Sequence, residues 1–147
     1  GVKLDIAGGV MPGDSEVYNT VTKSLCTSGF RYWGNIGETD KIQLLKSCRA
    51  LLYCAGQTQI HEHKTVEALM CGTPIICYDW GCAEEIGGGY IRVCKTESEF
   101  LDSIQSTLAF ETRMKAQSDW AISKYSPDAV IPAYIELYEK IANGERW

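Results

Sequence analysis

The sequence has no long hydrophobic run. None of its apolar segments approaches the roughly 20 residues that a membrane-spanning helix needs. The first residues also lack the charged and then apolar pattern of a signal peptide. We therefore expect a cytoplasmic protein without a transmembrane segment.

Positive charge is also scarce, with 14 Lys and Arg against 19 Asp and Glu and a formal net charge of -5. This balance gives no general attraction to nucleic acid or to an anionic membrane. We expect no nucleic-acid partner. Any anionic ligand must be held by groups close to it.

No Cys-x-x-Cys pair occurs among the seven cysteines, which are odd in number and fall mostly inside apolar runs. This pattern predicts reduced core residues of a cytosolic protein. Internal repeats and low-complexity linkers are absent as well, and 147 residues is the size of one ordinary domain. We therefore expect a single domain.

Short apolar segments bounded by turn residues predict buried strands of a parallel sheet. Segments with helical spacing lie between them and predict covering helices. The expected strands are Lys3–Ala7, Phe30–Trp33, Ala50–Cys54, Pro74–Tyr78 and Tyr90–Cys94. The expected helices between them are Ser15–Cys26, Asp40–Cys48 and Lys64–Cys71, the last ended by Gly72.

The last third of the chain changes character and is predicted to be helical. The expected helices are Glu97–Leu108, Glu111–Tyr125 and Asp128–Ala142, with Ser126 and Pro127 opening the last one. The sequence thus predicts an α/β fold, a parallel sheet flanked by helices with a helical C-terminal tail. Aromatic residues on these helices favour core or rim packing, or alternatively a surface for a partner.

Open parallel sheets bind ligands where the carboxyl ends of their strands meet loops and helix N-termini. The candidate loops are Gly8–Gly13, Gly34–Glu38, Ala55–His63 and Asp79–Cys82. The third of these loops leads into the most informative helix of the sequence.

In that helix, Val66, Leu69 and Met70 form the expected core stripe and Glu67 lies about a quarter-turn to one side. A carboxylate at the rim of a core needs partners, and the two vicinal hydroxyls of a ribose suit its two oxygens. Free backbone N–H groups around Glu62–Thr65 would attract a diphosphate at the positive end of the helix dipole. An acidic protein can hold an anion in this way.

The run from Gln59 to Ile76, with its Glu67, Ala68, a large apolar residue and Gly72-Thr73-Pro74, resembles the Glu-x7-Glu region of retaining GT-B glycosyltransferases of the group 1 or family 4 type. Four other segments resemble the same family: Leu4–Gly8, Gly34–Leu45, Asp79–Ile86, and Tyr125–Pro127 with Tyr134–Ile141. The resemblance implies a Rossmann-like fold, the C-terminal, donor-binding half of a GT-B enzyme. It covers nearly the whole chain.

The resemblance also implies roles for individual residues. Glu67 would hold the ribose of a nucleotide sugar, and Ile36 would lie against the base. Six further residues would contact the donor: Glu62, His63, Lys64, Thr65, Gly8 and Gly9. Gln59 takes the position of the first motif Glu. Glu85 corresponds to a glutamate that serves loop structure as readily as ligand binding.

Some residues depart from the family pattern. Gln59 can hydrogen-bond to sugar hydroxyls but cannot carry the negative charge that would stabilise a positively charged transition state. Glu62 and Lys64 stand where relatives commonly have Gly and Pro. The strand, arginine loop and lysine helix that clamp the phosphates in relatives would precede Gly1.

Other kinds of site find less support. His61 and His63 with Cys71 or Glu67 could suggest zinc, but two histidines two apart in a loop give no specific ligand spacing, and we expect no metal. Gly87–Gly89 lacks the Lys-Ser or Lys-Thr ending of a phosphate-binding loop. Gly8-Gly9 lacks the third glycine of a dinucleotide site, which argues against a dehydrogenase.

The expected function is transfer of a hexose from a nucleotide-diphosphate sugar to an acceptor, with retention and without a cofactor, in polysaccharide or glycoconjugate biosynthesis. The acceptor-binding domain would lie in the same longer chain or in a partner. We expect this chain alone to bind donor nucleotide weakly and to transfer sugar negligibly. The alternative is a non-catalytic nucleotide-binding or interaction module with the same fold.

Overall fold

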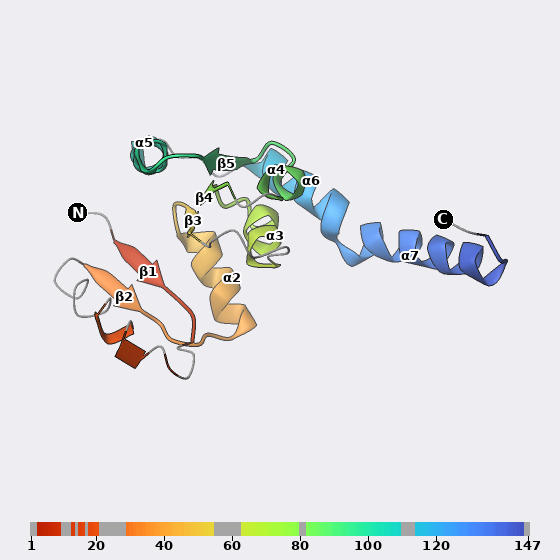
Figure 1. Ribbon diagram of the computed structural model, residues 1–147, viewed down its shortest axis with the longest axis horizontal. Helices are drawn as coiled ribbons and strands as arrows, with labels where there is room; N and C mark the ends of the chain where they lie inside the picture. Colours follow the sequence, from red (N-terminus) through yellow and green to blue (C-terminus); the bar gives the residue numbers. More distant parts are fainter. Residues whose placement is uncertain are drawn as a thin grey trace. The chain divides into compact units, whose positions relative to one another are not determined.

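The computed structural model describes residues 3–9, 13, 15–16, 18–20, 29–54, 63–79, 82–109 and 114–145 (Figure 1). The chain divides into two compact units, Gly1–Lys41 and Ile42–Trp147. Each unit is described by itself below.

The first unit is built on two parallel strands, β1 (Leu4–Ile6) and β2 (Phe30–Tyr32), paired with Leu4 opposite Phe30. Residues 15–16 and 18–20 are helical, as expected for part of the segment between the strands. Helix α2 (Glu38–Ser47) begins in this unit and ends in the second.

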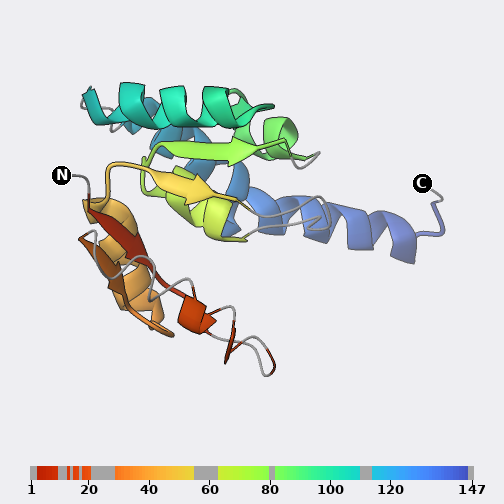
Figure 2. The same ribbon diagram turned by 60° about the vertical axis from the view of Figure 1, so that its left-hand side comes forward.

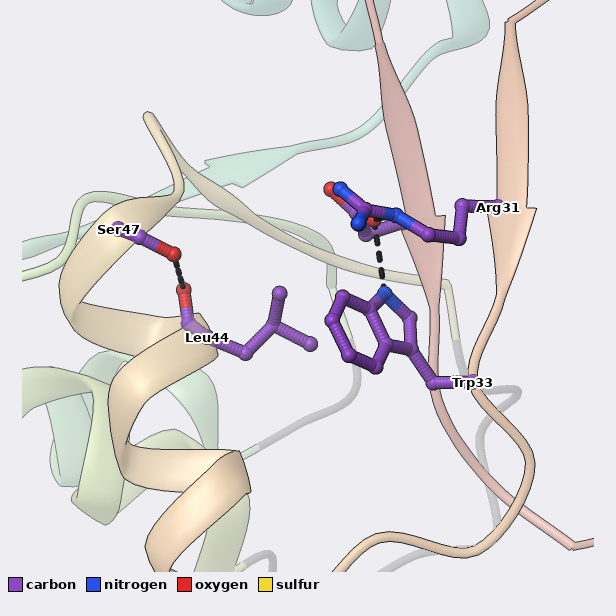
Figure 3. A network of polar contacts seen from close by, with 5 residues as sticks. Arg31, Trp33, Leu44 and Ser47 are labelled. Carbon is purple, nitrogen blue, oxygen red and sulfur yellow. Dashed lines mark hydrogen bonds and ion pairs between the residues drawn. The ribbon is translucent and has the colours of Figure 1, made fainter.

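A polar network ties β1 to β2 on one face of this small sheet. Asp5 Oδ1 accepts hydrogen bonds from Arg31 Nε at 2.9 Å and from Trp33 Nε1 at 2.8 Å. The Arg31 guanidinium also lies 4.5 Å from the centre of the Trp33 ring, and Figure 3 shows these two side chains together. The hydrogen bond from Trp33, supported by Arg31, lowers the pKa of Asp5 below its ordinary value.

The second unit holds a parallel sheet in the order β3-β4-β5, formed by Leu51–Tyr53, Ile75–Tyr78 and Ile91–Cys94. Each strand is followed by a helix in the chain: α3 (His63–Met70), the short α4 (Ala83–Gly87) and α5 (Glu97–Ala109). The alternation of strands and helices predicted this arrangement, because parallel neighbours need a crossover between them.

Helices cover both faces of this sheet, as Figure 2 shows. On one face, Ile76 and Cys94 pack with Phe100 of α5. On the other face, a larger cluster joins the strands to helices α3, α4 and α6 (Lys115–Tyr125). The buried members of this cluster are Leu45, Tyr53, Ala68, Leu69, Ile75, Cys77, Ala83, Ile86 and Ala121. The continuously apolar strands of the sequence are thus buried on both faces.

The C-terminal tail is helix α7 (Pro127–Ala142), which follows α6 directly. Ser126 caps it, since its Oγ accepts a hydrogen bond from the Ala129 amide at 3.3 Å, and Pro127 occupies the first turn. None of its residues is buried. Its exposed large apolar side chains are Ile131, Tyr134, Ile135, Leu137, Tyr138 and Ile141.

The five predicted strands are confirmed apart from details at their ends, and so are the predicted helices after β2, β3 and β5. Of the predicted helix Ser15–Cys26, only residues 15–16 and 18–20 are described, and these are helical. The structure corrects two predictions. Helix α4 forms directly after the expected Asp79–Cys82 loop, and Met114 has an extended backbone, so α6 begins at Lys115 and not at Glu111. Within the part of the chain that the structure describes, no helix is long and apolar enough to span a bilayer.

The cysteines are only partly the core residues that we expected. Cys77 and Cys94 are buried, whereas Cys54 is exposed and three others are half-buried. All six cysteines that the structure describes are free thiols. Cys26 lies outside the described residues.

Candidate functional site

The start of helix α3 lies at the carboxyl end of strand β3. The Lys64 ammonium sits 4.8 Å from the centre of the ring of Tyr53, the last residue of that strand. Because β3 and β4 are parallel and α3 connects them, the start of α3 lies at the carboxyl end of the sheet, which is the end where open parallel sheets generally bind ligands. Sequence reasoning missed Tyr53, although an aromatic residue ending a buried strand was the available signal.

The buried side of α3 differs from the predicted stripe. Thr65, Ala68 and Leu69 are fully buried, whereas Val66 and Met70 are half-buried at the margin of the core. The predicted stripe was therefore rotated by part of a turn. The small side chains of Ala68 and Thr65 allow close packing between helices. The prediction missed them because it assigned the largest apolar residues to the core.

Glu67 occupies the half-buried flank of α3, as predicted. Its Oε2 atom is inaccessible to solvent. Removing a carboxylate oxygen from water costs free energy unless the oxygen accepts hydrogen bonds. The Glu67 carboxylate is therefore placed to accept hydrogen bonds from polar groups. His63 and Lys64, in the first turn of the same helix, are exposed.

Thr65 is among the predicted donor contacts, but its complete burial was not predicted. Its side chain is fully buried, and its Oγ1 makes no hydrogen bond within the described structure. Burying a hydroxyl without a partner costs roughly 1–3 kcal/mol in proteins.

We expect Thr65→Val to raise the free energy of unfolding by about 1 kcal/mol, because it removes the unsatisfied hydroxyl and keeps the shape of the side chain. Thr73→Val is the matched control. Thr73 is equally buried, but its Oγ1 donates to Leu45 O at 2.7 Å, so its loss should destabilise the chain. Urea unfolding of both variants measures the difference. Equal destabilisation by the two substitutions would show that the Thr65 hydroxyl is satisfied in solution.

In the first unit, the Gly8-Gly9 turn lies beside Gly34 and Asn35. The Gly8 amide donates to Gly34 O at 2.9 Å, and the Tyr32 hydroxyl donates to Gly8 O. A Cβ added to Gly9 would lie 2.7 Å from Asn35 Oδ1, so a larger residue at this position would require the Asn35 side chain to move. Asn35 lies in the predicted candidate loop Gly34–Glu38, although it was not singled out there as a site residue.

Ile36 follows this pair of loops and is half-buried. The predicted contacts to base and donor therefore fall into two groups: Gly8, Gly9 and Ile36 in the first unit, and His63, Lys64, Thr65 and Glu67 in the second. Within each unit the structure brings its own group together. The assignment of all these residues to a ligand stays a prediction.

Two ionisable side chains lie at the carboxyl ends of neighbouring strands: Cys54 directly after β3 and Tyr78 as the last residue of β4. Desolvation raises the pKa of Cys54. Desolvation raises the pKa of Tyr78 as well, with further contributions from Glu97 and neighbouring thiols. Both groups therefore stay protonated at neutral pH, and neither is an activated nucleophile.

Several predicted residues lie outside the described residues: Gln59, His61 and Glu62. Their roles stay predictions. Among the residues that the structure does describe, no three His, Cys, Asp or Glu side chains are grouped closely enough to hold a metal ion. Glu85 is exposed on α4, where its charge contributes to the raised pKa of Tyr125.

No protein-family model matches the sequence, and no curated protein matches it. Solved structures do. AviGT4, a glycosyltransferase involved in avilamycin A biosynthesis, superposes with a TM-score of 0.78 at 21% identity, over 99% of this chain and 45% of AviGT4. HepE of Anabaena, solved with UDP and glucose, superposes with a TM-score of 0.74 at 16% identity, over 96% of this chain and 40% of HepE.

The comparison establishes the fold. The predicted class is confirmed: a Rossmann-like α/β arrangement of parallel strands flanked by helices, as in the C-terminal half of GT-B enzymes, with a helical C-terminal tail. The chain spans less than half the length of either neighbour.

Proposed function

We propose that this chain is the donor-binding part of a glycosyltransferase and that it binds a nucleotide-diphosphate sugar at the start of α3. One observation carries the proposal: a helix N-terminus, with a half-buried glutamate one turn further on, follows the carboxyl end of a buried parallel strand. Backbone amides and the helix dipole would hold the diphosphate. The Glu67 carboxylate would accept the two ribose hydroxyls.

The proposal explains how a protein with a net negative charge can bind an anionic ligand at one local site. Lys64 adds the nearest described cation of α3, but the amides are the main phosphate ligands, since they are fixed by the helix. HepE was solved with UDP and glucose, and its fold matches this chain. This likeness supports a uridine nucleotide as the first ligand to test.

The reaction would be transfer of a hexose with retention at the anomeric carbon, without a metal or another cofactor. The site offers electrostatic stabilisation by fixed dipoles, which needs no ionised nucleophile. Gln59 would contact sugar hydroxyls from the position of the first motif Glu. We place the protein in the cytoplasm, in polysaccharide or glycoconjugate biosynthesis.

A second, acceptor-binding domain would complete the site. Two observations support this part of the proposal. The structural neighbours are more than twice as long as the part of them that this chain matches. Helix α7 also exposes Ile131, Tyr134, Ile135 and Tyr138 at spacings of three and four residues, which gives one continuous apolar face. In a longer polypeptide, that face would pack on the acceptor domain.

The test is an NMR titration of the 147-residue chain with UDP, ADP and GDP. We expect one nucleotide to shift the amide signals of His63–Glu67 with a dissociation constant in the millimolar to high micromolar range, because the proposal assigns part of the site to a second domain. Nucleotide sugar alone should be turned over negligibly. If none of the three nucleotides shifts these signals at millimolar concentration, the proposed site is wrong. Full turnover by this chain alone would refute the need for a second domain.

A non-catalytic nucleotide-binding module is the second candidate. Gln59 favours it, because an amide cannot carry the charge of the first motif Glu. The two functions separate when the chain is joined to an acceptor domain and supplied with UDP-glucose and candidate acceptors, with Gln59→Glu measured in parallel. Hydrolysis or transfer by either form indicates an enzyme, and binding without either reaction indicates a module.

A further inference from the structure

The end of α3 that lies away from the proposed site is held by an unusually polar contact with helix α6. The turn after α3 is a Schellman motif: Gly72 N donates to Leu69 O and Thr73 N donates to Ala68 O, both at 2.9 Å, and Gly72 has a φ of 67°. This motif leaves the carbonyls of Met70, Gly72 and Thr73 pointing outward for other partners.

The first two turns of α6 supply those partners. Ser118 Oγ donates to Met70 O at 2.6 Å, and Gln117 Nε2 donates to Thr73 O at 2.8 Å. The Met114 amide approaches Gly72 O at 3.4 Å. A Cβ added to Gly72 would lie 3.2 Å from Met114 O, so glycine is what allows the turn and the helix to come so close.

Gln117 and Thr73 are the fully buried polar residues of this contact. Gln117 is 1% exposed, and Thr73 beside it is 0% exposed. The network also continues beyond the turn, since Thr73 Oγ1 donates to Leu45 O in the last part of α2. A buried amide in an apolar core costs free energy unless its hydrogen bonds are made, but once satisfied it fixes one geometry where apolar packing would allow several.

We infer that Gln117 is a positioning residue, which fixes the axial position of α3 and thereby the placement of its first turn and of Glu67. The expected effect on ligand binding rests on the proposed function. Helix α3 has eight residues and is therefore about 12 Å long, so a shift at its anchored end is carried to its other end as a rigid displacement. Binding groups need to be held within about 0.5 Å of their productive positions.

The test compares Gln117→Leu with Tyr125→Phe. Both substitutions remove one side-chain donor of α6 that bonds to a backbone carbonyl at 2.8 Å, but Tyr125 OH donates to Ile86 O of α4 and not to the turn after α3. We expect similar losses of stability from both. Only Gln117→Leu should weaken UDP binding, by about five- to tenfold at temperatures where both variants are fully folded. Equal UDP affinity in the two variants would overturn the inference.

Amide hydrogen exchange of Glu67–Met70, whose N–H groups are those that bond within α3, provides a readout without ligand. Exchange should accelerate in Gln117→Leu and stay unchanged in Tyr125→Phe; no difference would also overturn the inference. If the parent chain binds none of UDP, ADP and GDP, the proposed function fails while the exchange data still decide whether Gln117 holds α3. Should Gln117→Leu not fold, Ser118→Ala replaces it, because that side chain is half-buried and its loss is milder.

Discussion

Glu67→Gln should weaken the binding of UDP to this chain by roughly 10- to 100-fold, because a hydrogen bond to a charged acceptor is worth about 1.5–3 kcal/mol. The substitution keeps the size of the side chain and removes its charge. Glu67 is half-buried on α3, so the effect on the fold should be small compared with the effect on binding. Isothermal titration calorimetry or NMR line shapes measure the affinity, and thermal unfolding verifies the fold.

Glu84→Gln is the control for charge alone. Glu84 is an exposed glutamate of α4 in the same unit, so this variant has the same net charge as Glu67→Gln. Its UDP affinity should equal that of the parent chain. If the two variants bind UDP equally well, Glu67 does not contact the nucleotide and the proposed role of its carboxylate is wrong.

Gly88→Ala should lower the free energy of unfolding by about 2–4 kcal/mol, which combines overpacking with a strained left-handed backbone. Gly88 ends α4 with a φ of 51° and a ψ of 31°. A Cβ at this position would lie 2.0 Å from Cζ2 of the Trp120 indole and 2.7 Å from its Cε2. The indole itself is fixed between Tyr90 and Tyr125 at ring-centre distances of 5.3 and 5.9 Å, so it has little room to move.

Gly89→Ala separates the two causes. Gly89 also has a positive φ, of 88°, but an added Cβ would meet no atom within 4 Å. Its substitution should cost only about 1–2 kcal/mol of backbone strain. Thermal unfolding followed by circular dichroism compares both variants with the parent chain, and we expect a fall in Tm on the order of 10 °C for Gly88→Ala. Equal falls would mean that the indole does not pack on Gly88.

The strands and most helices could be predicted from the sequence because their signals are local. Continuous apolar runs gave β3 and β4, and Gly72 and Ser126-Pro127 marked helix ends that the structure confirms. Helix α4 was missed because five residues next to Gly87–Gly89 carry too short a pattern to show helical periodicity. The buried side of α3 was predicted wrongly because Thr65 and Ala68 are buried by tertiary packing, which the hydrophobicity of a residue does not indicate.

The site could be predicted only in part. The helix N-terminus and the position of Glu67 follow from the order of strand, loop and helix. The buried partners of the α3 turn do not, because Gln117 and Thr73 are 44 residues apart and only the fold brings them together. Polar residues in a helical pattern are usually solvent-exposed, so the burial of Gln117 had no signal in the sequence.

Strand β5 pairs with β4 on one side, and it is one of the two edge strands in the described part of its sheet. Its unpaired backbone groups could recruit a strand from another molecule, which is the usual first step of aggregation in sheet proteins. The exposed Arg92 near the middle of β5 opposes this step: its guanidinium Nη1 reaches Ser106 at 3.3 Å, and a second copy approaching along the same strand would bring like charges together. We therefore expect this single arginine to act as a gatekeeper residue against edge-to-edge pairing of β5.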